Sequence, residues 1–190
     1  MKIFLAVAVL VMAASCQNNN EKNDKSGQVA ISQEQKIKKG EYLVGIIGCG
    51  DCHTPKKMTE HGPVPDMDKF LSGHDASRPL ADYDKSIAMG GQWVLFNGDV
   101  TAAAGPWGVS FAANLTPDPT GLGNWDYEHF RKAMKEGKFK GIDAARSLLP
   151  PMPWQNFATM SDEDLQSIYE YLKTIRPVSN RVPDAILAGL

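Results

Sequence analysis

The stretch GIIGCGDCHTPKK at residues 45–57 decides how this chain is interpreted, because it contains the five residues CGDCH. Cys49 and Cys52 are separated by two residues, and His53 follows directly. This spacing is compatible with a covalently attached haem, with half of a zinc site and with a redox dithiol. It is also short enough to occur by chance, so the rest of the sequence has to choose.

The haem interpretation uses all three residues. Two thiols can add across the two vinyl groups of one porphyrin if they reach both sides of the ring, and an adjacent imidazole then ligates the iron. We therefore expect one haem c per chain, held by Cys49 and Cys52, with His53 as an axial ligand of the iron.

The competing chemistries need partners that the sequence does not offer. A zinc site requires a second pair of ligands at matching spacing. Cys16 is remote, and the other histidines stand alone (His61, His74 and His129). A redox dithiol belongs in a βαβ unit, whereas a helical pattern precedes CGDCH. A dithiol or zinc protein without haem is therefore the weaker alternative.

The first residues are typical of an export signal. Lys2 precedes an apolar run over 3–14 that is short for a membrane span, and the run stops just before Cys16. This pattern is similar to a bacterial lipoprotein signal. It implies a signal peptide at 1–15, lipidation of Cys16 and a flexible tether at 16–31. An ordinary cleaved signal with an incidental Cys16 is the alternative.

Composition excludes some classes of protein. Hydrophobic residues make up 43% of the 190 residues, so one ordinary globular core can form. The net charge of −2 argues against nucleic acid as a partner. Three cysteines do not describe a disulfide framework, because the number is small and odd.

Three segments have the pattern of helices. Ser32 and Gln35 form a capping-box pattern before the first segment, 32–48, in which Gly40 and Gly45 lower helix propensity and predict a close helix neighbour. The other two segments are 126–137 and 161–175. The stretch between residues 54 and 123 is rich in Pro and Gly, and we expect mostly loops there, with a short hairpin around Asn97–Gly98.

Four segments of the sequence resemble bacterial class I-like monohaem cytochromes c, especially the lipoprotein and dehydrogenase-associated branches. The resemblance covers about residues 36–183. It is carried by the segments GEYLVGIIGCGDCHTPK, NLTPDPTGLGNW, LLPPMPW and MSDEDLQSIYEYLKTIRPVSNRVP. It implies an all-α cytochrome c-like haem domain at 32–183, followed by a tail at 184–190. In this domain, the helix before Cys49 crosses the helix at 161–175.

The same resemblance implies that Met152 is the sixth ligand of the iron. Three prolines surround this residue and stiffen the backbone that must hold a thioether against iron. Packing in a proline turn is the alternative for Met152, while Met134 and Met160 are expected in the core. Met58, Met67 and Met89 are open as alternative ligands. Ligation by a second histidine is a minor option.

His53 and Met152 lie much further apart than a compact cytochrome c requires, so residues 54–113 are expected to be a loop-rich insertion around the haem edge. Its aromatic residues either line the haem pocket or serve ordinary packing (Trp93, Phe96, Trp107 and Phe111). Asn114, Trp125 and Arg131 are candidates for hydrogen bonds to the haem propionates, which need donors in a pocket of low dielectric constant.

These features predict a carrier of single electrons and no catalytic residues of its own, because His and Met ligands leave no open coordination site. The expected partners are redox proteins and, through the lipid, a membrane, on the periplasmic side of a bacterial cell. The chain is expected to work alone or as the cytochrome subunit of a dehydrogenase or oxidase complex. A haem enzyme or gas sensor with a labile or open sixth position is the rival hypothesis.

Overall fold

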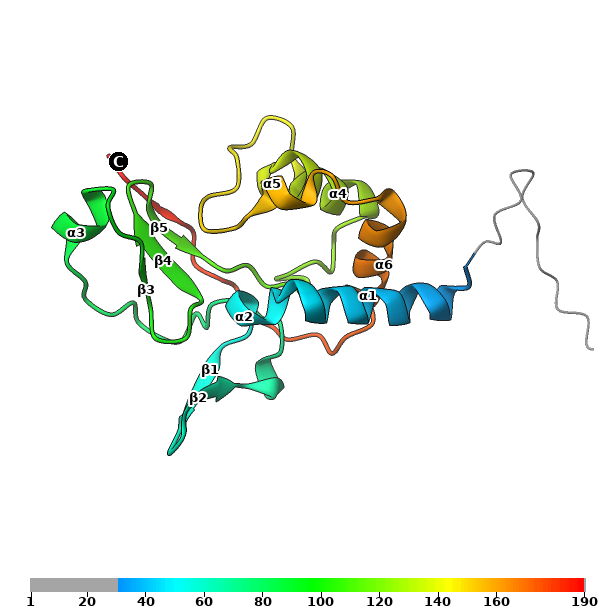
Figure 1. The fold of residues 1–190 in the computed structure, drawn as a ribbon, viewed down its shortest axis with the longest axis horizontal. Helices are drawn as coiled ribbons and strands as arrows, with labels where there is room; N and C mark the ends of the chain where they lie inside the picture. Colours follow the sequence, from blue (N-terminus) through cyan, green and yellow to red (C-terminus); the bar gives the residue numbers. More distant parts are fainter. Residues whose placement is uncertain (1–30, 190) are drawn as a thin grey trace, which may run out of the picture. The chain divides into compact units, whose positions relative to one another are not determined.

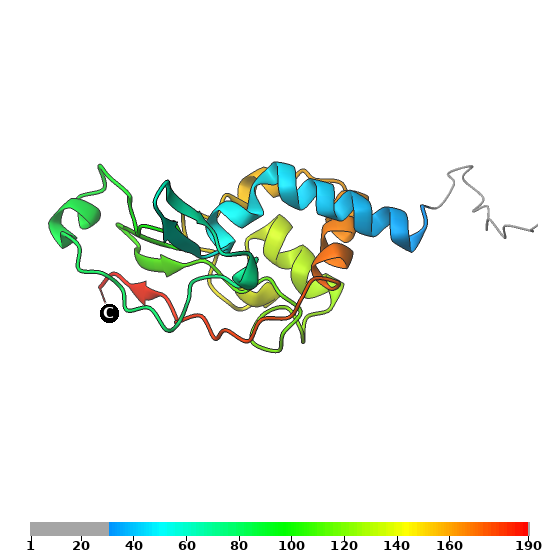
Figure 2. The ribbon, with the colours of Figure 1, turned by 90° about the horizontal axis from the view of Figure 1, so that it is seen from below.

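The computed structural model describes residues 31–189, in which the helices gather on one side and a four-stranded sheet lies beside them, with the short helix at Lys85–Met89 on the far side of the sheet (Figures 1 and 2). The predicted signal peptide, Cys16 and nearly all of the predicted tether lie outside these residues. Among the described residues, no helix has the length and apolar character needed to cross a membrane.

The expectation of an all-α fold is wrong, because the described residues combine helices with two antiparallel sheets. The helices are α1 (Gln33–Ile47), α2 (Cys49–His53), α3 (Lys85–Met89), α4 (Tyr127–Glu136), α5 (Trp154–Phe157) and α6 (Asp162–Leu172). The strands are β1 (Lys56–Thr59), β2 (Gly62–Pro65), β3 (Leu95–Phe96), β4 (Ala102–Gly105), β5 (Gly108–Phe111) and β6 (Ile186–Leu187).

Helix α1 begins and ends at the residues that the sequence predicted. The Ser32 side chain accepts a hydrogen bond from the Gln35 backbone, and the Gln35 side chain accepts one from the Ser32 backbone, which completes the capping box. Gly48 ends the helix with φ at 78°, a left-handed conformation that glycine adopts without steric cost. Because α2 follows at once, the cap fixes the direction in which the CGDCH segment leaves α1.

Helix α1 packs against α6, as predicted. A Cβ atom at Gly40 would lie 2.0 Å from the Ser167 carbonyl oxygen and 2.7 Å from Cβ of Tyr171, so only glycine fits this crossing. Gly45 has no such neighbour within 4 Å. The predicted close approach of another helix is therefore confirmed at Gly40 and wrong at Gly45.

The main core lies among α1, α4 and α6. Helix α4 has Asp126 as its N-cap and Gly137 in a left-handed C-cap, and α6 has Ser161 as its N-cap, all as the sequence predicted. The buried residues of this cluster come from all three helices and two loops: Val44, Leu71, Leu122, Phe130, Leu165, Ile168 and Leu172.

The region expected to be loops supplies most of both sheets. Strands β1 and β2 form a hairpin directly after α2, and β3, β4, β5 and β6 follow one another in the second sheet. The hairpin near Asn97 exists, but its second strand begins only at Ala102, and the residue with positive φ in its turn is Val100 and not Gly98. Residues 186–187, expected to lie in a tail, pair with β5.

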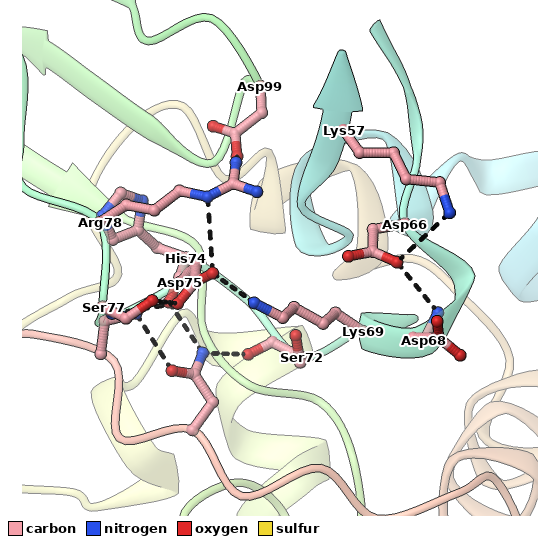
Figure 3. Close-up of polar contacts among 12 residues, drawn as sticks. Lys57, Asp66, Asp68, Lys69, Ser72, His74, Asp75, Ser77, Arg78 and Asp99 are labelled. Carbon is pink, nitrogen blue, oxygen red and sulfur yellow. Dashed lines mark hydrogen bonds and ion pairs between the residues drawn. The ribbon is translucent and has the colours of Figure 1, made fainter. Parts of the chain in front are cut away.

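A network of charged and polar side chains stabilises the region between β2 and β4 (Figure 3). Arg78 donates a hydrogen bond to the Asp99 carboxylate at 2.9 Å, and its Nε lies 3.5 Å from the Asp75 carboxylate. Asp75 also accepts a hydrogen bond from Lys69 at 2.5 Å. Both carboxylates are buried, and each is paired with a cation, as buried charges must be. The network joins the loop after β2 to the turn between β3 and β4.

Candidate functional site

The short helix α2 carries all three residues of the predicted attachment motif. Cys49 and Cys52 are three residues apart in a helix, so their side chains lie on the same side of it. Both thiols are half-buried, and neither forms a disulfide with any residue that the structure describes. Cys49 also packs against the main core. The two sulfurs are thus presented together beside an apolar surface.

His53 is held by one ring nitrogen, which leaves the other available. Its Nδ1 lies 2.7 Å from the carbonyl oxygen of Ala113, so Nδ1 carries the proton and donates it. The Nε2 atom makes no hydrogen bond to any described residue, and its lone pair is free. Burial lowers the pKa of His53, which keeps the imidazole neutral. A neutral, oriented imidazole with a free Nε2 has the form in which histidine binds a metal ion.

The surroundings of the thiols do not suit dithiol redox chemistry. Burial raises the pKa of Cys49 to about 11, and burial also raises the pKa of Cys52. Reactive redox cysteines have a lowered pKa, because the thiolate is the nucleophile. The part of the chain that the structure describes also holds no cluster of three or more His, Cys, Asp or Glu side chains that could bind a metal ion. These findings weigh against both alternatives to haem.

Met152 lies in a loop that is fixed on both sides. Before it, the Ser110 hydroxyl donates a hydrogen bond to the Pro150 carbonyl at 2.5 Å, and the Met152 amide bonds back to Leu149 at 3.3 Å. After it, the ring of Trp154 packs on the backbone of Gly137, where a Cβ atom would lie 2.4 Å from the ring.

The other methionines have different surroundings. Met134 and Met160 pack against the main core, which confirms the prediction for both. Met152 is half-buried and belongs to neither core cluster of the described residues. Met58 and Met67 are exposed. Met89 is also exposed. Among the described methionines, Met152 is therefore the one that is half-buried and yet outside both core clusters.

One short extended segment contacts both predicted ligand-bearing regions. Ser110, in β5, bonds to the loop of Met152, and Ala113 bonds to the ring of His53. These two residues are three positions apart, which is about 10 Å of extended chain. The segment from Ser110 to Ala113 therefore brings the loop of Met152 and the ring of His53 to the same part of the molecule.

The remaining histidines are occupied or exposed. The His61 side chain is 86% exposed at the tip of the β1–β2 hairpin, which leaves it without a surrounding pocket. His74 is buried and bonded to the Thr101 hydroxyl at 2.9 Å. His129 pairs with Asp126 on α4. None of them has the combination of burial and a free, oriented ring nitrogen beside two thiols that His53 has.

The structure gives the three candidate propionate contacts other partners. Asn114 is buried, and its amide nitrogen donates to the carbonyls of Val178 and Asn180. Arg131 pairs with Glu128 and Glu136, both on its own helix α4. Trp125 packs against the main core. These contacts assign no propionate donor, and the predicted roles stay predictions.

The aromatic residues of the insertion also differ from one another. Trp93 and Phe96 are exposed, and Phe111 packs on His74 with ring centroids 4.8 Å apart. Trp107 donates its ring N–H to the Ser110 hydroxyl at 3.2 Å. The roles of Ser110 and the Ala113 carbonyl were missed, because a serine in a strand and a backbone oxygen carry no signal in a single sequence.

The residues of α2 fit a covalently attached haem. Two half-buried thiols on one helix face, beside a neutral imidazole whose Nδ1 is held by a carbonyl, match the donor set that c-type attachment requires. The arrangement is compatible with thioether attachment to a porphyrin that has histidine as its proximal ligand.

Comparison with known proteins agrees with this class. The chain is 27% identical over 187 residues to the gluconate 2-dehydrogenase cytochrome c subunit of Pantoea cypripedii, which covers 97% of this chain and 31% of that protein. It is 29% identical over 157 residues to the cytochrome c subunit of the quinone-dependent alcohol dehydrogenase of Gluconobacter oxydans, covering 80% of this chain and 25% of that subunit. It is 28% identical over 156 residues to the fructose dehydrogenase cytochrome subunit of Gluconobacter japonicus, covering 81% of this chain and 24% of that subunit.

The chain is thus homologous to cytochrome c subunits of dehydrogenases. It spans about a third or less of the length of these relatives. No known family model matches it.

Proposed function

We propose that this chain is a c-type cytochrome that carries single electrons through one haem, bound to Cys49 and Cys52 and ligated by His53 and Met152. The observation that carries the proposal is the hydrogen bond from His53 Nδ1 to the Ala113 carbonyl. It leaves Nε2 free and oriented, next to two thiols on the same helix face. The presence of one CxxCH motif in the sequence supports one haem per chain.

The chain's own residues account for the properties of a carrier. The thiols of Cys49 and Cys52 anchor the group to α2, so it stays bound in both redox states. Ala113 fixes the tautomer of His53 and raises its basicity as a ligand. The proline loop fixes the backbone on both sides of Met152. Bound haem supplies the redox chemistry, and Met ligation raises its reduction potential.

The partner we propose is the catalytic subunit of a dehydrogenase, from which the chain accepts electrons. Support comes from the names of the three relatives reported above, which are cytochrome subunits of gluconate, alcohol and fructose dehydrogenases. We further propose export, lipidation of Cys16 and attachment to a membrane on its periplasmic side. The apolar run that stops at Cys16 supports this part of the proposal.

Mass spectrometry of protein from a host that attaches haem in its periplasm tests the core of the proposal. The expected mass is that of the processed chain plus one haem, retained after denaturation. Cys49→Ser with Cys52→Ser should lose the covalent haem. A bare polypeptide mass for the unmutated protein would contradict the proposal.

Visible spectra test the ligands. The ferric protein should show the weak far-red charge-transfer band of Met–Fe ligation, and the ferrous protein should not bind carbon monoxide readily. Ready binding of carbon monoxide would favour the rival haem enzyme or gas sensor.

A further inference from the structure

We propose that Ser110 is a positioning residue for the methionine ligand, through which the four-stranded sheet holds the Met152 loop against the iron. The inference rests on the proposed function, because it requires that Met152 ligates haem. Nothing in the sequence of the insertion or in the names of the relatives assigns such a role to the sheet.

The hydrogen bond that carries the inference joins the centre of a strand to the ligand loop. Ser110 lies in β5, opposite Ala103 of β4, and is 9% exposed. Its hydroxyl donates to the Pro150 carbonyl at 2.5 Å, two residues before Met152. A strand paired on both sides is a rigid anchor, because β5 is bonded to β4 and to β6.

A second hydrogen bond sets the direction of the first. Trp107 donates its ring N–H to the Ser110 oxygen at 3.2 Å and so occupies a lone pair of the hydroxyl. The hydroxyl proton then goes to the Pro150 carbonyl at 2.5 Å, which is much nearer than the Ala103 carbonyl at 3.4 Å. The Trp107 ring itself lies on Gly105, where a Cβ atom would be 2.4 Å from the ring. The Trp107 carbonyl accepts a hydrogen bond from Ala188 at 3.0 Å. Backbone and ring of Trp107 are therefore both fixed.

The anchor acts on Met152 through a tight turn. The Met152 amide bonds to the Leu149 carbonyl, so the peptide group of Pro150 lies inside the turn that presents the thioether. Without the Ser110 bond, the Pro150 carbonyl loses its buried donor and the turn gains freedom on this side. The Trp154 contact with Gly137 would then hold the loop from the other side alone.

The expected consequence is a methionine that is more easily displaced from iron. A net hydrogen bond of ordinary strength corresponds to a change of about 2- to 10-fold in an equilibrium constant. We expect Ser110→Ala to bind imidazole to the ferric haem about 2- to 10-fold more tightly than the unmutated protein. Its far-red band should weaken and its reduction potential should fall, because the thioether favours ferrous iron.

Matched variants separate positioning from general damage to the fold. Ser110→Thr keeps the hydroxyl on a residue that suits a strand, and should restore the imidazole affinity of the unmutated protein. Trp107→Phe keeps an aromatic side chain, smaller than the indole, and loses the N–H that bonds to the hydroxyl, so we expect a smaller change in the same direction. Ser86→Ala removes a serine hydroxyl in the same insertion, bonded to Asp84 at 2.6 Å, and should change nothing.

A double-mutant cycle tests whether Ser110 acts through Met152. In the Met152→Ala background, which has no thioether to displace, Ser110→Ala should change the imidazole affinity by less than about twofold. If Ser110→Ala fails to fold, Trp107→Phe takes its place in the cycle.

The outcomes distinguish this inference from the proposed function. If Met152→Ala leaves the spectrum of the unmutated protein unchanged, the ligand assignment is wrong and the inference falls with it. If Met152→Ala changes the spectrum while Ser110→Ala leaves the band, the potential and the imidazole affinity unchanged, the inference alone is overturned. An equal effect of Ser110→Ala with and without Met152 would also overturn it.

Discussion

The crossing of α1 and α6 makes a sharp prediction for the two glycines of α1. At Gly40, a methyl group would lie 2.0 Å from a backbone carbonyl oxygen and 2.7 Å from Cβ of Tyr171. Neither neighbour is the flexible end of a side chain, so the two helices must separate. At Gly45, the same methyl group would meet nothing within 4 Å.

The magnitudes follow from these two environments. Overpacking of a tight contact costs about 1–3 kcal/mol, and the backbone clash at Gly40 places it at the upper end. Replacement of glycine by alanine inside a helix returns about 1 kcal/mol of helix propensity. We expect Gly40→Ala to lower the free energy of unfolding by about 2 kcal/mol and Gly45→Ala to raise it by about 1 kcal/mol.

Guanidinium unfolding followed by far-ultraviolet circular dichroism measures both variants. The midpoint should fall for Gly40→Ala and rise for Gly45→Ala, with slopes close to that of the unmutated protein. A Gly40→Ala variant at least as stable as the unmutated protein would refute the reasoning, because it would mean that α1 and α6 do not cross at this distance.

Three further predictions concern the ligand, the anchor and the polar network. Met152→Ala should keep the covalent haem but lose the far-red band and lower the reduction potential. Met160→Ala should leave the spectrum unchanged and lower the free energy of unfolding by about 1–2 kcal/mol, because Met160 is half-buried. The opposite pattern would assign the ligand to Met160. Cys16→Ser should move the protein from the membrane to the soluble periplasmic fraction, and a variant that stays on the membrane would place the anchor elsewhere. Burial alone would raise the pKa of Asp75, but hydrogen bonds from Lys69 and Ser77 outweigh burial, and the net pKa is lowered. The ionised Asp75 carboxylate therefore stabilises the fold above the ordinary pKa of 3.8, and this stabilisation is lost as the pH falls below that value. Asp75→Asn should therefore destabilise the protein by about 1–3 kcal/mol at pH 7, with a smaller difference in acid unfolding measured below about pH 4; a difference independent of pH would contradict this account.

The helices could be predicted from sequence because their signals are local. The capping box at Ser32, the N-caps at Asp126 and Ser161 and the glycine stops at Gly48 and Gly137 each lie within a few residues of the helix end that they specify. The boundaries at these positions were predicted closely for that reason.

Apart from the hairpin near Asn97, the strands could not be predicted, because their stability comes from pairing between distant segments. Ala102–Gly105 has low intrinsic strand propensity, yet it forms a central strand between β3 and β5. The prolines and glycines near it predict loops, although antiparallel hairpins of four-residue strands need such residues at their turns. The two-residue strand β6 has no periodicity to detect.

The candidate site, too, could be predicted only in part. The motif residues on α2 were predicted from their spacing, and Met152 was predicted from its prolines and from the resemblance. The Ala113 carbonyl, which bonds to the His53 ring, and the Ser110 hydroxyl, which bonds to the loop of Met152, come from β5 and the residues just after it, which the sequence did not reveal. Chemical identity is encoded locally, whereas orientation depends on the tertiary structure.

The pairing of β6 with β5 has a consequence for the order in which the chain folds. Residues 186–187 bond to residues 108–109, and α6 must be present before α1 can bury Gly40. Contacts over such long sequence separations form slowly, because loop closure costs entropy before the contacts are made. The thiol of Cys49, which packs against the main core in the folded chain, is therefore accessible for a period before that core forms. Under the proposed function, enzymes that attach haem would act during this period, when the pKa of Cys49 is not yet raised by burial.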